Sequence, residues 1–173
     1  MKDFIIRLME IKMEVKFKKL YDDSICPKKG SKYDAGFDLY AHGLPDEGIN
    51  LRPGETVMIG TGIATAIPEG WFGAIYARSG LACKQNIRPS NCVGVIDASF
   101  RQEVMVSLHR DFRAKWKEEC ISFAVLAVGE PYHINNGDRI AQMIFHQVPD
   151  FEFVEVDELD ETDRGEGFGS SGK

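Results

Sequence analysis

Short β-prone runs separated by turn residues set the strongest limit on how this chain can fold. Residues 13–20 alternate between apolar and polar side chains, and residues 56–66 are apolar and β-branched. Further short runs, rich in apolar and aromatic side chains, occupy residues 71–77, 121–128 and 140–148. Gly, Pro, Asn and Asp recur at the breaks between runs. Many short strands with regular turns are typical of a β-sandwich or β-barrel, so we expect an all-β domain.

The segment from residue 91 to residue 105 carries the clearest candidate for chemistry. It reads as a hairpin, because two β-prone runs flank the break Asp97-Ala-Ser. A carboxylate fixed at the end of a strand can hold and deprotonate a water molecule. Phe100, three residues further on, supplies a ring that can pack against a sugar or a base. The plainer alternative is a surface hairpin in which Asp97 is an ordinary turn residue.

Four further segments accompany this hairpin: Asp34–Ala41, Ala77–Lys84, Gly137–Phe145 and Arg164–Gly172. In order and spacing, the five segments resemble the five motifs of the trimeric deoxyuridine triphosphatase (dUTPase) family, with Pro68–Trp71 between the first two as additional support. The resemblance runs from about Val15 to the C-terminus. It implies a jelly-roll-like β domain, a homotrimer that exchanges arms between subunits, and hydrolysis of dUTP to dUMP and pyrophosphate.

The resemblance also implies roles in the hairpin. Asp97 falls at the position of the carboxylate that activates the attacking water. Phe100 stands where the family usually has Tyr, and it would pack on the deoxyribose and exclude a 2′-hydroxyl. The positions that contact uracil in the family are occupied by Asn91, Val95, Ile96 and Met105.

The triphosphate would be held by residues of the second and fourth motifs. Arg78 offers a forked, permanently charged set of donors, and Ser79 a hydroxyl for the oxygen that bridges the α and β phosphates. Gly80 allows close backbone approach, and Gln142 would touch a phosphate unless it is a solvent-facing strand residue. Asp38 leaves two alternatives open: a supporting carboxylate at the phosphate end, or a buried partner that holds an arginine.

The C-terminal residues 157–173 are acidic and then rich in glycine, so we expect a mobile arm. Its last residues spell GxxxxGK, but the chain ends there without the Ser/Thr and the helix that a P-loop needs. By resemblance the arm closes over a neighbouring subunit's site, through Arg164 on the terminal phosphate and Phe168 on the uracil, followed by Gly169 and Ser170. Only one glycine, Gly167, precedes the Phe, where the family usually has two.

The charge and composition of the chain limit the classes of partner that it can bind. A net charge of −6 argues against a broad nucleic-acid surface, and no apolar run is long enough for a membrane span. Scattered His and Cys residues without ligand spacing predict no protein-built metal site. The resemblance implies Mg²⁺ held by phosphates and water, and unpaired cysteine spacing favours reduced thiols and a cytoplasmic location.

The expected organisation is an extension at residues 1–12, a β domain at 13–156 and the arm at 157–173. Residues 111–119 are charged and read as a surface insertion, either a short helix or a solvated loop. Such an insertion could capture a protein partner, so a dUTPase-like regulatory protein is one alternative function. A relative of dCTP deaminase, which shares the fold family and uses a catalytic Glu, is a more distant alternative, because the Asp97 hairpin fills the position of that chemistry and a dUTPase-type tail follows it.

Overall fold

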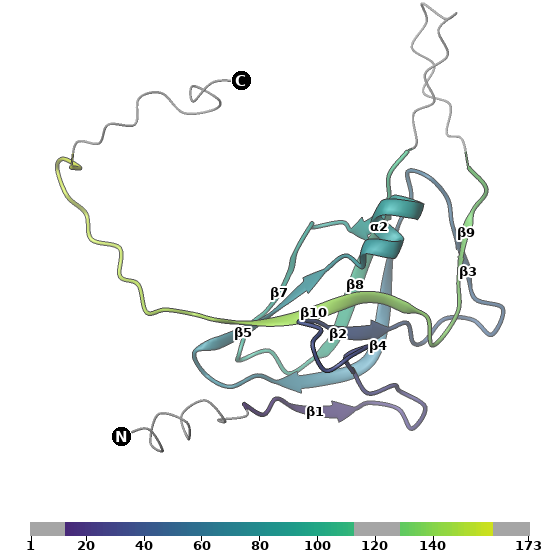
Figure 1. Ribbon diagram of the computed structural model, residues 1–173, viewed down its shortest axis with the longest axis horizontal. Helices are drawn as coiled ribbons and strands as arrows, with labels where there is room; N and C mark the ends of the chain where they lie inside the picture. Colours follow the sequence, from purple (N-terminus) through teal and green to yellow (C-terminus); the bar gives the residue numbers. More distant parts are fainter. Residues whose placement is uncertain (1–12, 113–128, 161–173) are drawn as a thin grey trace, which may run out of the picture.

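The computed structural model describes residues 13–112 and 129–160 (Figure 1). This part of the chain is built from short strands and one short helix, α2, at Ser79–Gln85. The strands are β1 Lys16–Lys19, β2 Phe37–Tyr40, β3 Ile49–Leu51, β4 Thr56–Ala66, β5 Trp71–Tyr76, β6 Ile87–Pro89, β7 Gly94–Ile96, β8 Glu103–Arg110, β9 Tyr132–Ile134 and β10 Arg139–Gln147.

Two four-stranded sheets form the body of the molecule. One has the strand order β1-β4-β8-β6 and the other the order β2-β10-β5-β7, while β3 and β9 form a separate two-stranded ribbon. All the pairings between these strands are antiparallel. The expected all-β, jelly-roll-like fold is therefore confirmed.

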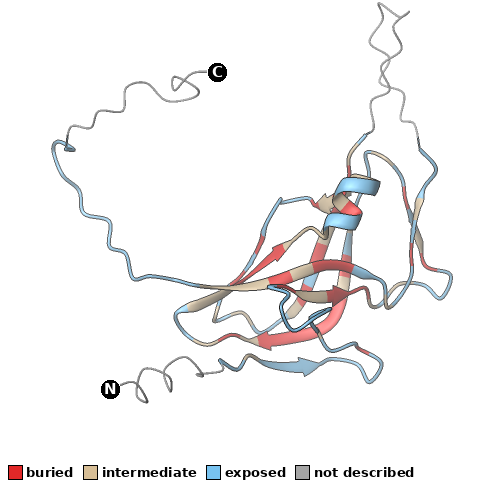
Figure 2. Cartoon of the chain, in the orientation of Figure 1, coloured by how far each residue is buried: buried red, intermediate tan, exposed pale blue. Residues whose placement is uncertain are grey.

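The buried residues of the strands form the core between the sheets, and β8 shows the alternation in burial most clearly. In β8, Val104, Val106 and Leu108 are buried, whereas Met105 between them is exposed. Period-two alternation places successive side chains on opposite faces, so each sheet keeps one face for the core. Figure 2 shows this buried layer along β4 and β8, with exposed residues on β1 and beyond the end of β10.

Four of the five runs read from the sequence are strands. They correspond to β1, β4, β5 and β10, with boundaries that agree within a few residues. All four residues of β1 are exposed although their alternation suggested a half-buried strand, since β1 is the edge of its sheet. The fifth run, 121–128, lies outside the described residues, as do the extension 1–12, most of the insertion 111–119, and the arm from 161 onward.

The hairpin expected between residues 91 and 105 is wrong. β7 pairs with β5 in one sheet, and β8 pairs with β4 and β6 in the other, so the two strands do not pair with each other. The turn after Ile96 is a crossover between sheets. Two β-prone runs around a short break predict a hairpin locally, but the buried faces of β7 and β8 are completed by different sheets.

A close approach inside β4 depends on a glycine. The register of β4 against β8 shifts between Gly60 and Ala64, and Gly62 within this irregularity has φ +67°. A Cβ atom there would come within 2.3 Å of the buried Ser24 hydroxyl and 2.9 Å of the His42 ring. Both the backbone conformation and the packing therefore require glycine at this position.

We expect Gly62→Ala to lower the free energy of unfolding by roughly 2 to 4 kcal/mol, from strained φ and overpacking together. Gly70 is the matched control, because its φ is +77° but no atom lies within 4 Å of its would-be Cβ. Gly70→Ala should therefore cost only about 1 to 2 kcal/mol. Urea unfolding of both variants measures the difference, and equal losses would show that the contact with Ser24 is unimportant.

Candidate active site

A carboxylate with two arginines forms the centre of the candidate site. Asp38 Oδ1 accepts a hydrogen bond from Arg78 Nε at 3.0 Å, and Asp38 Oδ2 accepts one from Arg139 Nη1 at 3.3 Å. Arg78 Nη1 also donates to the carbonyl of Arg139 at 3.1 Å. The Asp38 side chain is only 16% exposed. Two guanidinium groups around one carboxylate leave a local excess of positive charge, which suits an anionic ligand.

Strand register brings these residues together from distant parts of the chain. Asp38 on β2 and Tyr76 on β5 are both paired with Gln142 on β10, so the three side chains share one face of the sheet. Arg78 lies two residues after the end of β5 and is the residue before α2. Arg139 is the first residue of β10.

Gln142 fixes the segment that carries Arg78. Its Nε2 donates to the carbonyl of Ala77 at 2.9 Å, and its side chain is half-buried rather than solvent-facing. Gly36 makes room for it, since a Cβ at that position would lie 2.5 Å from Gln142 Oε1. Besides the expected contact with a phosphate, Gln142 therefore has a second role that the sequence did not suggest: it positions the segment that carries Arg78.

The observed contacts of Asp38 are compatible with both of its expected roles. It is a half-buried strand residue that holds an arginine, and it lies at the centre of the positively charged cluster. Tyr40 lies two residues further along β2 and is buried. Burial, and secondly the charge of Asp38, raise the pKa of Tyr40 above its usual value, so its hydroxyl is neutral at physiological pH.

Asp97 lies on a well-fixed turn at the end of β7. The amide of Phe100 donates to the carbonyl of Asp97 at 3.0 Å, and Arg101 Nη1 donates to the carbonyl of Phe100 at 2.8 Å. The ring of Phe100 packs against the core, whereas the Asp97 side chain is exposed. The turn therefore presents a carboxylate to solvent on a rigid support.

The chain before Asp97 forms an open loop in place of the expected hairpin. The Ser90 amide donates to the Ser107 carbonyl at 2.7 Å, and the two hydroxyl groups are also 2.7 Å apart, so this pair closes the loop. Beyond it, β7 diverges to the edge of one sheet while β8 continues in the other. Of the residues at the family's uracil-contact positions, Asn91, Val95 and Met105 are exposed and Ile96 is buried.

Asp97 and the arginine cluster lie toward opposite ends of β5. Asp97 follows the pair Ile96–Gly73, while Asp38 and Gln142 lie in the row of Tyr76. The rows of Gly73 and Tyr76 are about 10 Å apart, from the rise per residue of a strand, and Asp97 and Arg78 continue outward from them. Within one copy the two groups are too far apart to act on the same phosphate.

Some of the other predicted site residues lie within the described part of the chain, and some lie outside it. Ser79 and Gly80 are exposed at the start of α2. Arg139 was not among the candidate residues named from the sequence; its position beside Asp38 is set by pairing between segments 101 residues apart. Arg164, Phe168, Gly169 and Ser170 lie outside the described residues.

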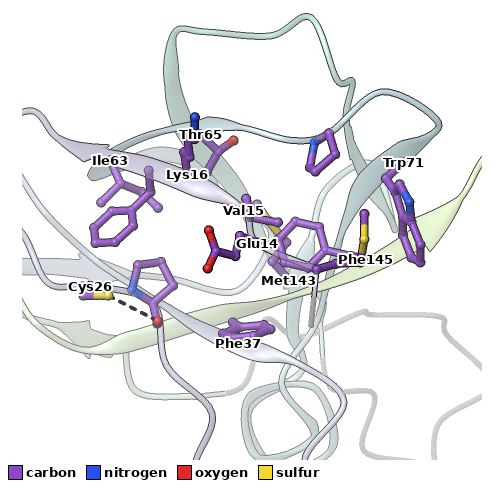
Figure 3. Close-up of a pocket in the computed structure, with 14 residues that line it drawn as sticks. Glu14, Val15, Lys16, Cys26, Phe37, Ile63, Thr65, Trp71, Met143 and Phe145 are labelled. Atoms are coloured by element: carbon purple, nitrogen blue, oxygen red, sulfur yellow. Dashed lines mark hydrogen bonds between the residues drawn. The ribbon is translucent and has the colours of Figure 1, made fainter. Parts of the chain in front are cut away.

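An apolar cavity of about 450 Å³ lies elsewhere, beside β1. Figure 3 shows Phe37, Trp71, Met143 and Phe145 around it, on the face of the β10 sheet opposite to Asp38. Thr65 lines the same cavity, and its buried hydroxyl has no hydrogen-bond partner within the part of the chain that the structure describes. Among residues 13–112 and 129–160, no group of three His, Cys, Asp or Glu could hold a metal ion. No helix in these same ranges is long and apolar enough to cross a membrane.

Known proteins with similar sequences are dUTPases. The dUTPase family model matches residues 22–114 and 111–172. The deoxyuridine 5'-triphosphate nucleotidohydrolase of Corynebacterium glutamicum is 38% identical over 160 residues, which cover 92% of this chain and 95% of the relative. That of Nautilia profundicola is also 38% identical, with 93% and 100% covered.

Solved structures agree with these sequence matches. A variant of the Staphylococcus bacteriophage 80alpha dUTPase, solved with dUpNHpp and described among phage dUTPases that control transfer of virulence genes, has a TM-score of 0.73 at 29% identity. The match covers 93% of this chain and all of that one. A dUTPase variant from phage phi11 of S. aureus, described with a structural Mg(II) ion, has a TM-score of 0.68 at 27% identity, with 85% and 99% covered.

The family match extends through all five motifs and nearly the whole length of the sequence, and the all-β fold agrees with it. The chain belongs to the dUTPase family.

Proposed function

We propose that the chain hydrolyses dUTP at a site shared between copies, in which the Asp97 turn of one copy faces the Asp38–Arg78–Arg139–Gln142 cluster of another. The observation that carries this proposal is the separation of the two groups toward opposite ends of β5. A catalytic base acts on a water within hydrogen-bond reach of the reacting phosphorus. A second copy supplies the missing half, as the homotrimer of the family would.

Asp97 would act as the general base. Its exposed carboxylate accepts a proton from a water molecule, whose oxygen attacks the α-phosphorus of dUTP in line with the leaving group. A new P–O bond forms, the bond from the α-phosphorus to the bridging oxygen breaks, and pyrophosphate leaves with that electron pair. The fixed turn from Asp97 to Phe100 supports this role because it holds the carboxylate on a rigid element.

The arginine cluster would hold the triphosphate. Arg78 uses Nε and Nη1 on Asp38 and on a backbone carbonyl, which orients the remaining face of its guanidinium. Ser79, exposed directly after Arg78, is proposed to donate to the bridging oxygen where charge develops. Asp38 and Gln142 act mainly as positioning residues, because their contacts described above fix the Arg78 segment.

Uracil would bind at the open loop before Asp97, in the opening between β7 and β8. β7 is an edge strand, so its outer backbone groups are available to hydrogen-bond the edge of a base. Val95 and Ile96 would act through these backbone groups, with Asn91 and Met105 close to the opening. A site built to pair with one donor and acceptor pattern rejects other bases, because they leave buried groups unpaired. Phe100 would pack on the deoxyribose.

Mg²⁺ fits this site as an ion carried by the phosphates. The cluster presents arginine side chains, and both oxygens of the Asp38 carboxylate already contact arginines. Mg²⁺ would therefore take its ligands from phosphate oxygens and water. When bound, Mg²⁺ would supply positive charge to offset the charge on the leaving pyrophosphate. The residues of this chain supply the remaining positive charge.

Residues 148–160 support association with further copies. Beyond β10, apolar and acidic residues alternate, and Phe151 and Phe153 are both highly exposed. An apolar stripe of this kind is stabilised only when another surface covers it. Exchange of this segment and the following arm between subunits would cover it and would bring Arg164 and Phe168 to a neighbour's site.

A regulatory role through a protein partner is a second candidate, supported by the likeness to phage dUTPases that control transfer of virulence genes. The insertion 111–119 is the proposed contact.

Free thiols at Cys26, Cys83 and Cys92 support a cytoplasmic location.

Asp97→Asn should lower kcat by roughly 10² to 10⁴, the usual contribution of a positioned base, while nucleotide binding is retained. Pyrophosphate release from dUTP measures kcat, and calorimetry with dUMP measures binding. Turnover near the parental rate would remove Asp97 from the mechanism.

Mixing tests whether the site is shared. Asp97→Asn and Arg78→Gln chains, each inactive alone, are unfolded together and refolded at equal amounts. In a shared site, a quarter of the random neighbour pairs combine an intact Asp97 with an intact Arg78, so activity should return to about one quarter of the parental value. Activity that stays at the level of the separate variants would place the whole site within one copy.

Phe100 should select the sugar by ring contact alone. Phe100→Tyr should therefore keep the preference for dUTP over UTP, measured as the ratio of kcat/KM values, whereas Phe100→Ala should reduce it. If the Ala variant keeps the parental ratio, another group excludes the 2′-hydroxyl.

A further inference from the structure

We propose that Lys28 is a further phosphate-binding residue of the shared site, an inference that rests on the proposed function. Lys28 precedes the first motif and was not among the residues that the sequence pointed to. In the structure it forms an isolated antiparallel bridge with Asp38, and its carbonyl accepts a hydrogen bond from the Asp38 amide at 2.9 Å. It therefore lies beside the carboxylate at the centre of the arginine cluster.

The bridge also determines the direction of the Lys28 side chain. Residues directly opposite each other in an antiparallel pair point to the same face, with Cβ atoms about 5 Å apart. Asp38 pairs with Gln142 on its other side, and Gln142 with Tyr76. Lys28, Asp38, Gln142 and Tyr76 therefore form one row on one face, and the ammonium of Lys28 belongs to the face where the triphosphate would bind.

Charge explains what Lys28 can do there. Each oxygen of Asp38 already contacts an arginine, and in the described part of the chain Lys28 makes no ion pair. Its side chain is exposed, so it is available to a ligand. A lysine ammonium is a compact charge with three donors and suits phosphate oxygens, which a flexible stem can reach from the edge of the site.

Lys29 provides an internal comparison. It is the next residue in the chain, but its ammonium lies 5.2 Å from the centroid of the Phe37 ring. Phe37 precedes Asp38 on β2 and lines the apolar cavity, so it belongs to the opposite face of the sheet. The two neighbouring lysines thus have the same charge and similar exposure, but only Lys28 lies on the phosphate face.

The test compares Lys28→Gln, Lys28→Arg and Lys29→Gln in the full-length chain. For dUTP hydrolysis, Lys28→Gln should reduce kcat/KM roughly three- to tenfold, mainly through KM, as expected for a partly exposed charge-assisted contact. Lys28→Arg should restore most of the loss, and Lys29→Gln should stay within about twofold of the parental enzyme, the range of a weak surface contact. The slope of log kcat/KM against log salt concentration should fall only in Lys28→Gln.

Product inhibition separates a phosphate contact from a structural effect. The inhibition constant of inorganic pyrophosphate should rise in Lys28→Gln, while that of dUMP should change less. Equal losses in the Lys28 and Lys29 variants would overturn the proposal in favour of general charge attraction, and an unchanged KM in Lys28→Gln would overturn it outright. A parental chain that fails to hydrolyse dUTP would instead contradict the proposed function.

Discussion

The contact of one carboxylate with two arginines holds the candidate site together. Asp38 comes from β2, Arg139 from the start of β10, and Arg78 from the segment that leaves β5, so a single residue ties three strands at one end of a sheet. Asp38 costs free energy to desolvate, and the two charged donors offset that cost. Because each arginine is held on one side, its other donors are oriented before any ligand arrives, which lowers the entropic cost of binding a phosphate.

The layout of the sheet that contains β5 accounts for the division of chemistry between copies that we propose. β5 is a common element: its Gly73 end carries β7 and the Asp97 turn, and its far end leads to Arg78. A strand is stiff, so no local movement of side chains can bring these two ends together. In the proposed shared site, catalysis requires the assembly of several copies. The exposed apolar segment after β10 would contribute to that assembly.

Local sequence patterns predicted the strands well and their partners poorly. The apolar, β-branched and aromatic composition of residues 56–66 and 140–148 identified β4 and β10, because such runs between turn residues favour strands. The hairpin at 91–105 was wrong because a break between two apolar runs does not reveal which sheet receives each run. Arg139 and Lys28 were missed for a related reason: both lie beside Asp38 only through pairing between segments distant in sequence. The motif residues themselves were accessible to sequence reasoning through family resemblance.

The open loop before Asp97 has one side in each sheet, since β7 adds to β5 and β8 to β4. The width of this opening therefore depends on the distance between the two sheets. Side chains in the interior, such as Ile75 and Val106, set that spacing although they are buried far from solvent. Nucleotide selectivity in this fold would then respond to the volume of the interior, and a change in core packing could alter which base is accepted without altering any residue that touches it.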